Sequence, residues 1–414
     1  NFFSNAYLTY ILPYIYMVIA FIFLKPINKE NKIKGIYFYI AILISIWFLA
    51  AIFFAIRALM AGVELSDIVN LRIVQSGSII VTIISICKIV NQLDYWNFNN
   101  IEKLKFLLKV TMIQAVIVIF MMILPELRTV LLEHFYQYGN GNEFTMAKRV
   151  YGIMSNYTFA TPIFHGLLAS IALSAGILYD RKLYYYIPFL LLMIVFNGRT
   201  GMLVFILGVI INFIYFILKN KYIKKAMIGL IVILLLSFMS LGIIKSYKPE
   251  TYAFLIAGIE DVVNYMFYNE KSGNIEVLSS DVTDNINLRT FLIGNGHKIQ
   301  NSGDIPQNIQ FDSSYSDMGY LNDMYMAGVL YMFLLYIPIV WIILKKQKNI
   351  KMQNKEKCIN DIFEIVAILT VFSCNLKGEV FRSSIIIAGI IYLKLILSGK
   401  ENKDEESINN NVNL

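Results

Sequence analysis

Eleven stretches of mostly apolar residues alternate with polar segments along the chain, and the polar segment between Lys245 and Gly319 is much longer than the others. About 20 apolar residues are enough to cross the hydrocarbon core of a bilayer as a helix. The pattern therefore predicts eleven membrane-spanning helices, at residues 6–24, 35–57, 71–90, 106–124, 161–179, 184–197, 200–218, 226–245, 319–344, 361–376 and 383–398. The predicted fold class is all-α, a polytopic helical bundle in a membrane.

This pattern divides the chain into four parts. Residues 1–245 hold the first eight predicted spans, residues 246–318 form the large loop, residues 319–398 hold the last three spans, and the polar tail at 399–414 is expected to be disordered. The composition agrees with a membrane protein, because only 15% of the residues are charged, whereas about 25% is usual in a soluble domain.

Lysines predict the orientation of the bundle. They concentrate in the loops at 25–34, 103–105, 219–225 and 345–357, which all fall on one side when the spans are counted along the chain. An excess of lysine and arginine marks the cytoplasmic side of short loops. We therefore expect a multi-pass protein of the cytoplasmic membrane with its N-terminus outside, its C-terminus inside and the 246–318 loop outside.

The arginines have the opposite distribution. On this topology only Arg181 is cytoplasmic, and seven of the eight arginines lie at outer helix ends or in outer loops, namely Arg57, Arg72, Arg128, Arg149, Arg199, Arg289 and Arg382. The planar, permanently charged guanidinium suits recognition of phosphate. The alternative is that each arginine only extends its charge out of the membrane. We favour an anionic ligand at the outer leaflet, and lipids linked through pyrophosphate fit that description.

Two outer breaks carry candidate binding residues. In the segment from Arg149 to Pro162, before the fifth span, Arg149 is expected to contact an anion and Asn156 a sugar hydroxyl; the alternative is a re-entrant or interfacial loop. Between the sixth and seventh spans, residues 197–201 read Asn-Gly-Arg-Thr-Gly and predict a tight turn. A plain turn needs no arginine, so we expect Arg199 to bind ligand.

The large loop holds weaker signals. Gly294 and Gly296 indicate a turn, and Arg289 lies just before it among the expected substrate contacts. His297 is a candidate acid or base because histidine titrates near neutral pH, although a single loop histidine is often incidental. His165, at the start of the fifth span, is expected to be buried.

A denser cluster leads into the ninth span. It consists of three carboxylates and two aromatic residues, Asp312, Tyr315, Asp317, Tyr320 and Asp323. A carboxylate there can deprotonate a sugar hydroxyl, and aromatic rings stack on sugar faces. The alternative is helix capping by aspartate beside an interfacial belt of tyrosines.

The last outer break, at 375–383, contains Lys377, Glu379 and Arg382. Charges at the membrane boundary are costly unless they are paired or bind a ligand. We expect Lys377 and Arg382 to contact substrate, with a Glu379–Arg382 ion pair as the alternative.

Together these features resemble the O-antigen polymerase/ligase superfamily. The resemblance is carried by Gly198-Arg-Thr-Gly201, Arg149-Val-Tyr-Gly152, Gly294-Asn-Gly296 and Asp317-Met-Gly-Tyr320 with Gly328, and it spans most of the chain. It implies a Wzy-type polymerase of surface polysaccharide that joins undecaprenyl-pyrophosphate-linked oligosaccharides without a metal ion or other cofactor. The resemblance also implies that Arg199 and Arg149 contact the donor pyrophosphate or glycan. The ligase branch typically has a His-Asn pair where this chain has Asp317 and Gly319, which favours a polymerase.

The predicted mechanism is electrostatic. Outer arginines stabilise the pyrophosphate leaving group while a hydroxyl of a second lipid-linked repeat attacks C1 of the donor sugar. Asp317, or else Asp312, is expected to help deprotonate that hydroxyl. The expected partners are the lipid-linked oligosaccharide, membrane lipids, and a chain-length regulator and flippase, with no nucleic acid. The alternatives are a ligase of the same superfamily, a lipid-oligosaccharide flippase or transporter, and a membrane scaffold.

Overall fold

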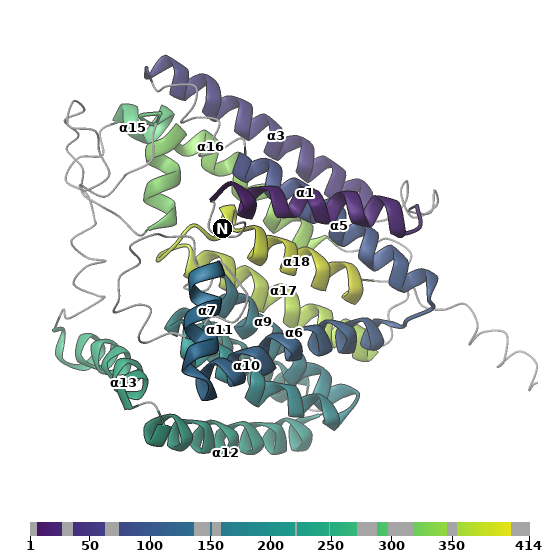
Figure 1. The fold of residues 1–414 in the computed structure, drawn as a ribbon, viewed down its shortest axis with the longest axis vertical. Coiled ribbons are helices and arrows are strands. Elements are labelled where there is room, and N and C mark those ends of the chain that lie inside the picture. Colours follow the sequence, from purple (N-terminus) through teal and green to yellow (C-terminus); the bar gives the residue numbers. More distant parts are fainter. Residues whose placement is uncertain are drawn as a thin grey trace, which may run out of the picture.

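The computed structural model describes residues 6–26, 36–62, 74–135, 150, 159–219, 222–247, 249–270, 288–296, 318–345 and 354–398. Within these ranges every regular element is a helix and no strand occurs, as the apolar pattern predicts (Figure 1). Residues Arg149, Asn156, His297, Asp312, Tyr315 and Asp317, and the tail at 399–414, lie outside the described residues.

A helix covers each of the eleven predicted ranges. These helices are α1 (Ala6–Phe23), α3 (Ile36–Met60), α5 (Val74–Tyr95), α6 (Asn100–Ile123), α9 (Ala160–Leu178), α10 (Ile187–Asn197), α11 (Arg199–Lys219), α12 (Ile223–Tyr247), α16 (Gly319–Leu344), α17 (Asn354–Cys374) and α18 (Ser384–Leu397). Among the described residues six are long and apolar enough to cross a membrane, namely α3, most of α5, α6, α9, α11 and α16. The protein is an all-α, multi-pass membrane bundle, and the total of eleven spans stays a prediction.

The segments between the spans also contain helices. They are α7 (Pro125–Phe135), the 3₁₀ turn η2 (Arg181–Tyr186), α13 (Pro249–Val263), the π-turn η3 (Asn264–Tyr268), α15 (Leu288–Ile293) and the 3₁₀ turn η4 (Val380–Arg382). The large loop predicted at 246–318 is therefore helical in the parts that the structure describes.

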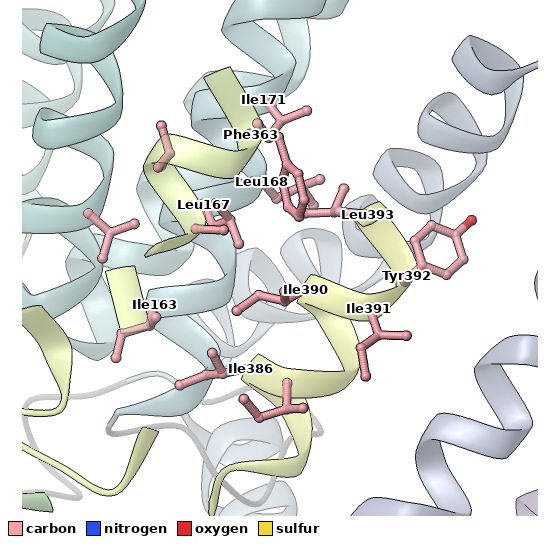
Figure 2. Packing of buried hydrophobic residues seen from close by; sticks show 14 of the residues in the cluster. Ile163, Leu167, Leu168, Ile171, Phe363, Ile386, Ile390, Ile391, Tyr392 and Leu393 are labelled. Carbon is pink, nitrogen blue, oxygen red and sulfur yellow. The ribbon is translucent and has the colours of Figure 1, made fainter. Parts of the chain in front are cut away.

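Helix α9 is the core of one half of the bundle. Every residue of α9 except Phe164 is buried, and Figure 2 shows its isoleucine and leucine side chains facing those of α17 and α18. Small residues allow this close packing. A Cβ atom added to Gly166 would come within 2.3 Å of the Gly201 carbonyl oxygen, so α9 and α11 touch through their backbones. The remaining helices α1, α3, α5 and α16 form a second group, and α17 and α18 lie between the two (Figure 1).

The two ends of the bundle differ in charge. At one end, called the lysine end, Lys103 pairs with Asp94 at 2.5 Å, Lys105 pairs with Asp180 at 2.9 Å, and Arg181 follows directly. At the other end, called the arginine end, lie Arg57, Arg199, Arg289 and Arg382. The separation of lysine from arginine that the sequence predicts is therefore present in the described part of the chain. Which side of the membrane each end faces stays a prediction.

Candidate functional site

Helix α16 is broken near its start. Ala327 and Gly328 have non-helical backbone angles, and Gly328 has φ 75° and ψ −175°. The span predicted at 319–344 is present, and the break lies within it. A transmembrane helix tolerates such a break only where other groups satisfy the carbonyls that it frees.

The turn at residues 294–296 satisfies those carbonyls. The Asn295 N–H donates to the Tyr325 carbonyl at 2.6 Å, and the Gly296 N–H donates to the Met326 carbonyl at 2.9 Å. Both glycines of this turn have positive φ, as the sequence indicates for a turn. Backbone contact is direct, since a Cβ atom on Gly294 would lie 2.4 Å from the Ala327 nitrogen. This turn of the large loop is thus hydrogen-bonded to the backbone of α16 at the break.

Arg57, at the end of α3, holds the same turn from the other side. Its Nε donates to the Ile293 carbonyl at 2.9 Å, and its Nη2 donates to the Gly294 carbonyl at 2.7 Å. The side chain is buried, and its fork contacts two consecutive carbonyls. The Arg57 guanidinium therefore has hydrogen-bond partners within the protein. This differs from the alternative that the arginine only extends its charge out of the membrane.

Replacing Arg57 with methionine is expected to release the turn from the α16 break. Hydrogen bonds from a charged donor contribute about 1.5–3 kcal/mol each. We therefore expect hydrogen exchange at the amides of Asn295 and Gly296 to accelerate at least tenfold. Mass spectrometry of exchanged peptides measures this, with Arg181→Met at the lysine end as the control. Unchanged exchange in the Arg57→Met protein would contradict the assigned role.

A network of buried charges lies next to the break. The Arg382 guanidinium pairs through Nε with Asp323 at 2.7 Å and through Nη2 with Glu379 at 2.6 Å, and Nη1 donates to the Met326 sulfur at 3.2 Å. The Asp323 side chain is fully buried, Arg382 is 4% exposed and Glu379 is 20% exposed. The Glu379–Arg382 pair that the sequence offers as an alternative is therefore present, with a second carboxylate added.

Tyr336 and Asn375 extend the network beyond Asp323. The Tyr336 hydroxyl donates to Asp323 Oδ2 at 2.6 Å, and the Asn375 amide donates to the Tyr336 hydroxyl at 3.0 Å. Asn375 also accepts the Val380 N–H at 3.0 Å, so the same amide orients the start of η4. The five residues of this network, Glu379, Arg382, Asp323, Tyr336 and Asn375, come from α16, the end of α17 and η4. They are called the Glu379 network below.

Aromatic rings and a small recess border the network. Tyr336 stacks on Phe381 with ring centroids 3.9 Å apart, and Tyr320 meets Tyr336 edge-on and donates its hydroxyl to the Phe372 carbonyl at 2.8 Å. Arg382 and Phe381 line a recess between α3, α5, α16 and η4, together with Trp47, Ala51, Ser76, Ile79, Tyr331 and Leu335. One edge of the network is therefore adjacent to a gap between helices.

Close backbone contacts bring the outer breaks together at the arginine end. A Cβ atom on Gly319 would meet the Gly378 carbonyl oxygen at 2.4 Å, and one on Gly378 would meet the Phe159 ring at 2.3 Å. A Cβ atom on Gly201 would meet the Pro162 carbonyl oxygen at 2.2 Å. The turn that carries Arg199 and the break that carries Lys377 and Glu379 therefore both contact the start of α9.

The described residues expected to form the site have different surroundings. Arg199 begins α11 and is partly exposed, Lys377 is partly exposed in the loop after α17, and Arg289 is exposed on α15. Arg382 is matched by two carboxylates. The network therefore carries one formal negative charge in excess (+1 − 2 = −1). Of the expected anion contacts within the described residues, Arg199, Lys377 and Arg289 are the accessible ones.

The sequence interpretation missed Tyr336 and Asn375 as members of the network, since Tyr336 is one polar residue inside an apolar run and Asn375 is one at the end of such a run. It also missed Glu364 and Lys394, which form a buried pair at 2.7 Å between α17 and α18. Here a signal existed, because a charge inside a predicted span is unusual by itself.

His165 is buried, as expected. No group of described His, Cys, Asp and Glu side chains is suited to hold a metal ion.

No family model matches the chain, no curated protein matches it, and no solved structure matches it.

Proposed function

We propose that this protein is a membrane glycosyltransferase that polymerises undecaprenyl-pyrophosphate-linked oligosaccharide repeats into a surface polysaccharide at the outer face of the cytoplasmic membrane. The observation that carries the proposal is the meeting of separate outer breaks at the arginine end. The turn with Arg199, the glycine turn at 294–296, the start of α16 and the break with Lys377 come from distant parts of the sequence and gather around one end of the bundle. Several of these segments carry the resemblance to the O-antigen polymerase/ligase superfamily.

The chemistry assigned to this end is electrostatic. The donor sugar leaves a pyrophosphate, whose negative charge grows as the C1–O bond breaks. Arg199 is partly exposed at the first position of α11, where the helix N-terminus also favours an anion. Lys377 precedes Gly378, which packs against the Phe159 ring at the start of α9, and it adds a second cation. In this proposal the partly exposed Arg199 and Lys377 bind the pyrophosphate, and the buried Arg382 orients its neighbours.

Replacing Arg199 with alanine is expected to abolish long polysaccharide chains. Loss of one group that stabilises the leaving charge reduces a rate by about 100- to 1,000-fold, and polymer length depends on many such steps. The measurement is a gel of surface polysaccharide from a deletion strain that expresses the variant, with Arg181→Ala as the matched control. Arg199→Lys keeps the charge without the fork and should retain part of the activity.

A second arginine variant makes the test sharper. Arg149→Ala is expected to shorten the polysaccharide as well, because the resemblance assigns Arg149 to the same ligand. Long chains that persist in both variants at normal protein levels would rule out the phosphate role. The deletion strain also separates the ligase alternative. Loss of a polymerase leaves single repeats on the cell surface, whereas loss of a ligase leaves polymer attached to the lipid.

The alternative of a lipid-oligosaccharide flippase is separated by experiment. Transporters often place charged groups in mid-membrane. The buried Glu364–Lys394 pair instead lies toward one end of α18, because Lys394 is in the last turn of that helix. Proteoliposomes distinguish the two functions, since a flippase moves the lipid-linked repeat across the bilayer without lengthening it.

A further inference from the structure

Glu379 is the most accessible member of a network whose other charged groups are buried. Its side chain is 20% exposed, compared with 4% for Arg382 and none for Asp323. The residue lies between the end of α17 and η4, at the arginine end. The Glu379 carbonyl accepts the Arg382 N–H at 3.2 Å. The N–H of the next residue, Val380, donates to the side chain of Asn375. Both its backbone and its carboxylate are therefore held in place.

The rest of the network orients that carboxylate. Arg382 holds Glu379 at 2.6 Å, Asp323 holds Arg382 at 2.7 Å, and Tyr336 holds Asp323 at 2.6 Å. Nucleophiles and bases in enzymes are commonly positioned in this way, by a second group that is itself oriented by a third. An isolated surface ion pair contributes about 0–1 kcal/mol and needs no such support. The arrangement instead resembles a reactive carboxylate with its positioning residues.

Asp323 is unsuited to react with a substrate. Its carboxylate is fully buried, with Oδ1 on Arg382 and Oδ2 on Tyr336. Glu364 is 7% exposed and lies ten residues from the end of α17, far from the arginine end. Of these three carboxylates, Glu379 is therefore the one that combines access with a fixed geometry at the arginine end.

We propose that Glu379 is the catalytic base that accepts the proton of the attacking sugar hydroxyl. The proposal rests on the proposed glycosyl transfer and deepens it. The acceptor oxygen forms a bond to C1 of the donor sugar, and the C1–O bond to pyrophosphate breaks. The bonding electron pair leaves with the pyrophosphate, and the hydroxyl proton passes to the Glu379 carboxylate. Water takes this proton after the lengthened product has moved away.

The placement of the charges fits that step. Direct displacement at C1 requires the nucleophile and the leaving group on opposite faces of the sugar. The turn that carries Arg199 packs against Pro162, and Gly378, next to Glu379, packs against the Phe159 ring, so both segments contact the start of α9. In this proposal the donor sugar occupies the space between the anion-binding group and the base. Arg382 is a positioning residue in this account, because its contacts are to the protein.

The test uses the purified full-length protein in nanodiscs with the lipid-linked repeat extracted from its own deletion strain. Replacement of a general base lowers kcat by about 100- to 10,000-fold. We expect that loss for Glu379→Gln, with KM changed less than threefold. Glu379→Asp should retain intermediate activity. Glu126→Gln, on the exposed face of α7, is the matched control.

A rescue experiment separates base catalysis from a structural role. Formate at high concentration should restore the activity of Glu379→Ala at least tenfold, because the small carboxylate can occupy the vacated space. Arg382→Lys should lower kcat with little change in KM, since the base is then less well oriented. Failure of formate to rescue a folded Glu379→Ala protein, or a Glu379→Gln protein with more than a tenth of the wild-type kcat, would overturn the assignment.

The outcomes also separate this inference from the proposed function. If the wild-type protein makes no polymer from its lipid-linked repeat, the proposed function fails and the role of Glu379 fails with it. If the wild type polymerises and Glu379→Gln does so equally well, only the role of Glu379 is wrong. Loss of activity in Asp317→Asn but not in Glu379→Gln would return the base to the residue expected from the sequence.

Discussion

Replacing Asp323 with alanine is expected to destabilise the protein by up to about 3–5 kcal/mol, because it breaks a buried ion pair and leaves Arg382 with the partly exposed Glu379 alone. Asp323 is fully buried, pairs with Arg382 at 2.7 Å and accepts the Tyr336 hydroxyl at 2.6 Å. Its loss therefore also removes the acceptor of a buried hydroxyl, an effect of about 1–3 kcal/mol that overlaps with the first. The variant should unfold at a much lower SDS fraction in mixed micelles.

A double variant checks the physical reason. Asp323→Leu combined with Arg382→Met removes both buried charges and leaves only the partly exposed Glu379. An apolar replacement of a buried ion pair is often neutral or stabilising. We expect the double variant to recover at least half of the stability lost in Asp323→Ala. Trp47, which lines the recess beside Arg382, provides a fluorescence signal for the unfolding. A double variant as unstable as the single one would mean that packing, rather than charge, stabilises this region.

Replacing Gly328 with alanine is expected to destabilise the arginine end by about 2–6 kcal/mol. Its backbone, with φ 75° and ψ −175°, lies in a region that is essentially restricted to glycine, which adds about 1–3 kcal/mol of strain for another residue. The new Cβ atom would also lie 2.2 Å from the Leu292 carbonyl oxygen. Overpacking of this kind costs about 1–3 kcal/mol. The turn at 294–296 must then move away from α16.

Gly62 offers a matched control for the strain. It also has a positive φ, 77°, but nothing lies within 4 Å of a Cβ atom there. Gly62→Ala should therefore destabilise the protein only through backbone strain, by about 1–2 kcal/mol. Hydrogen exchange at the Asn295 and Gly296 amides should accelerate in Gly328→Ala and stay unchanged in Gly62→Ala. Equal behaviour of the two variants would show that close contact with the large loop contributes nothing.

The same contacts connect the network to the break. Met326 precedes the break, donates its N–H within α16, accepts the Gly296 N–H through its carbonyl, and receives Arg382 Nη1 on its sulfur. Arg57 holds the turn from α3. The positions of Glu379 and of the large loop therefore depend on a shared set of contacts at the start of α16. Variants of Gly328 should lower the activity of the Glu379 network as well as the stability.

The sequence by itself determined the class of the fold and its main asymmetry. A membrane span requires a long local run of apolar residues, so the helices could be read from composition along the chain. Successive spans run in alternating directions, so their order along the chain assigns each loop to one side of the bundle. That assignment predicts the separation of lysines from arginines. The tight turn at 197–201 could be predicted as well, because glycine is a local signal. It is present, with α10 ending at Asn197 and α11 beginning at Arg199.

The tertiary structure decided which polar residues meet. Arg57 and Gly294 are 237 positions apart, and the carboxylate and guanidinium of Asp323 and Arg382 come from different helices. No local pattern reports such pairings. The break in α16 is similar, because a glycine in an apolar run does not show whether another segment will satisfy the carbonyls that a break would free. In a bilayer those groups require partners within the protein, and only the folded chain shows that the large loop supplies them.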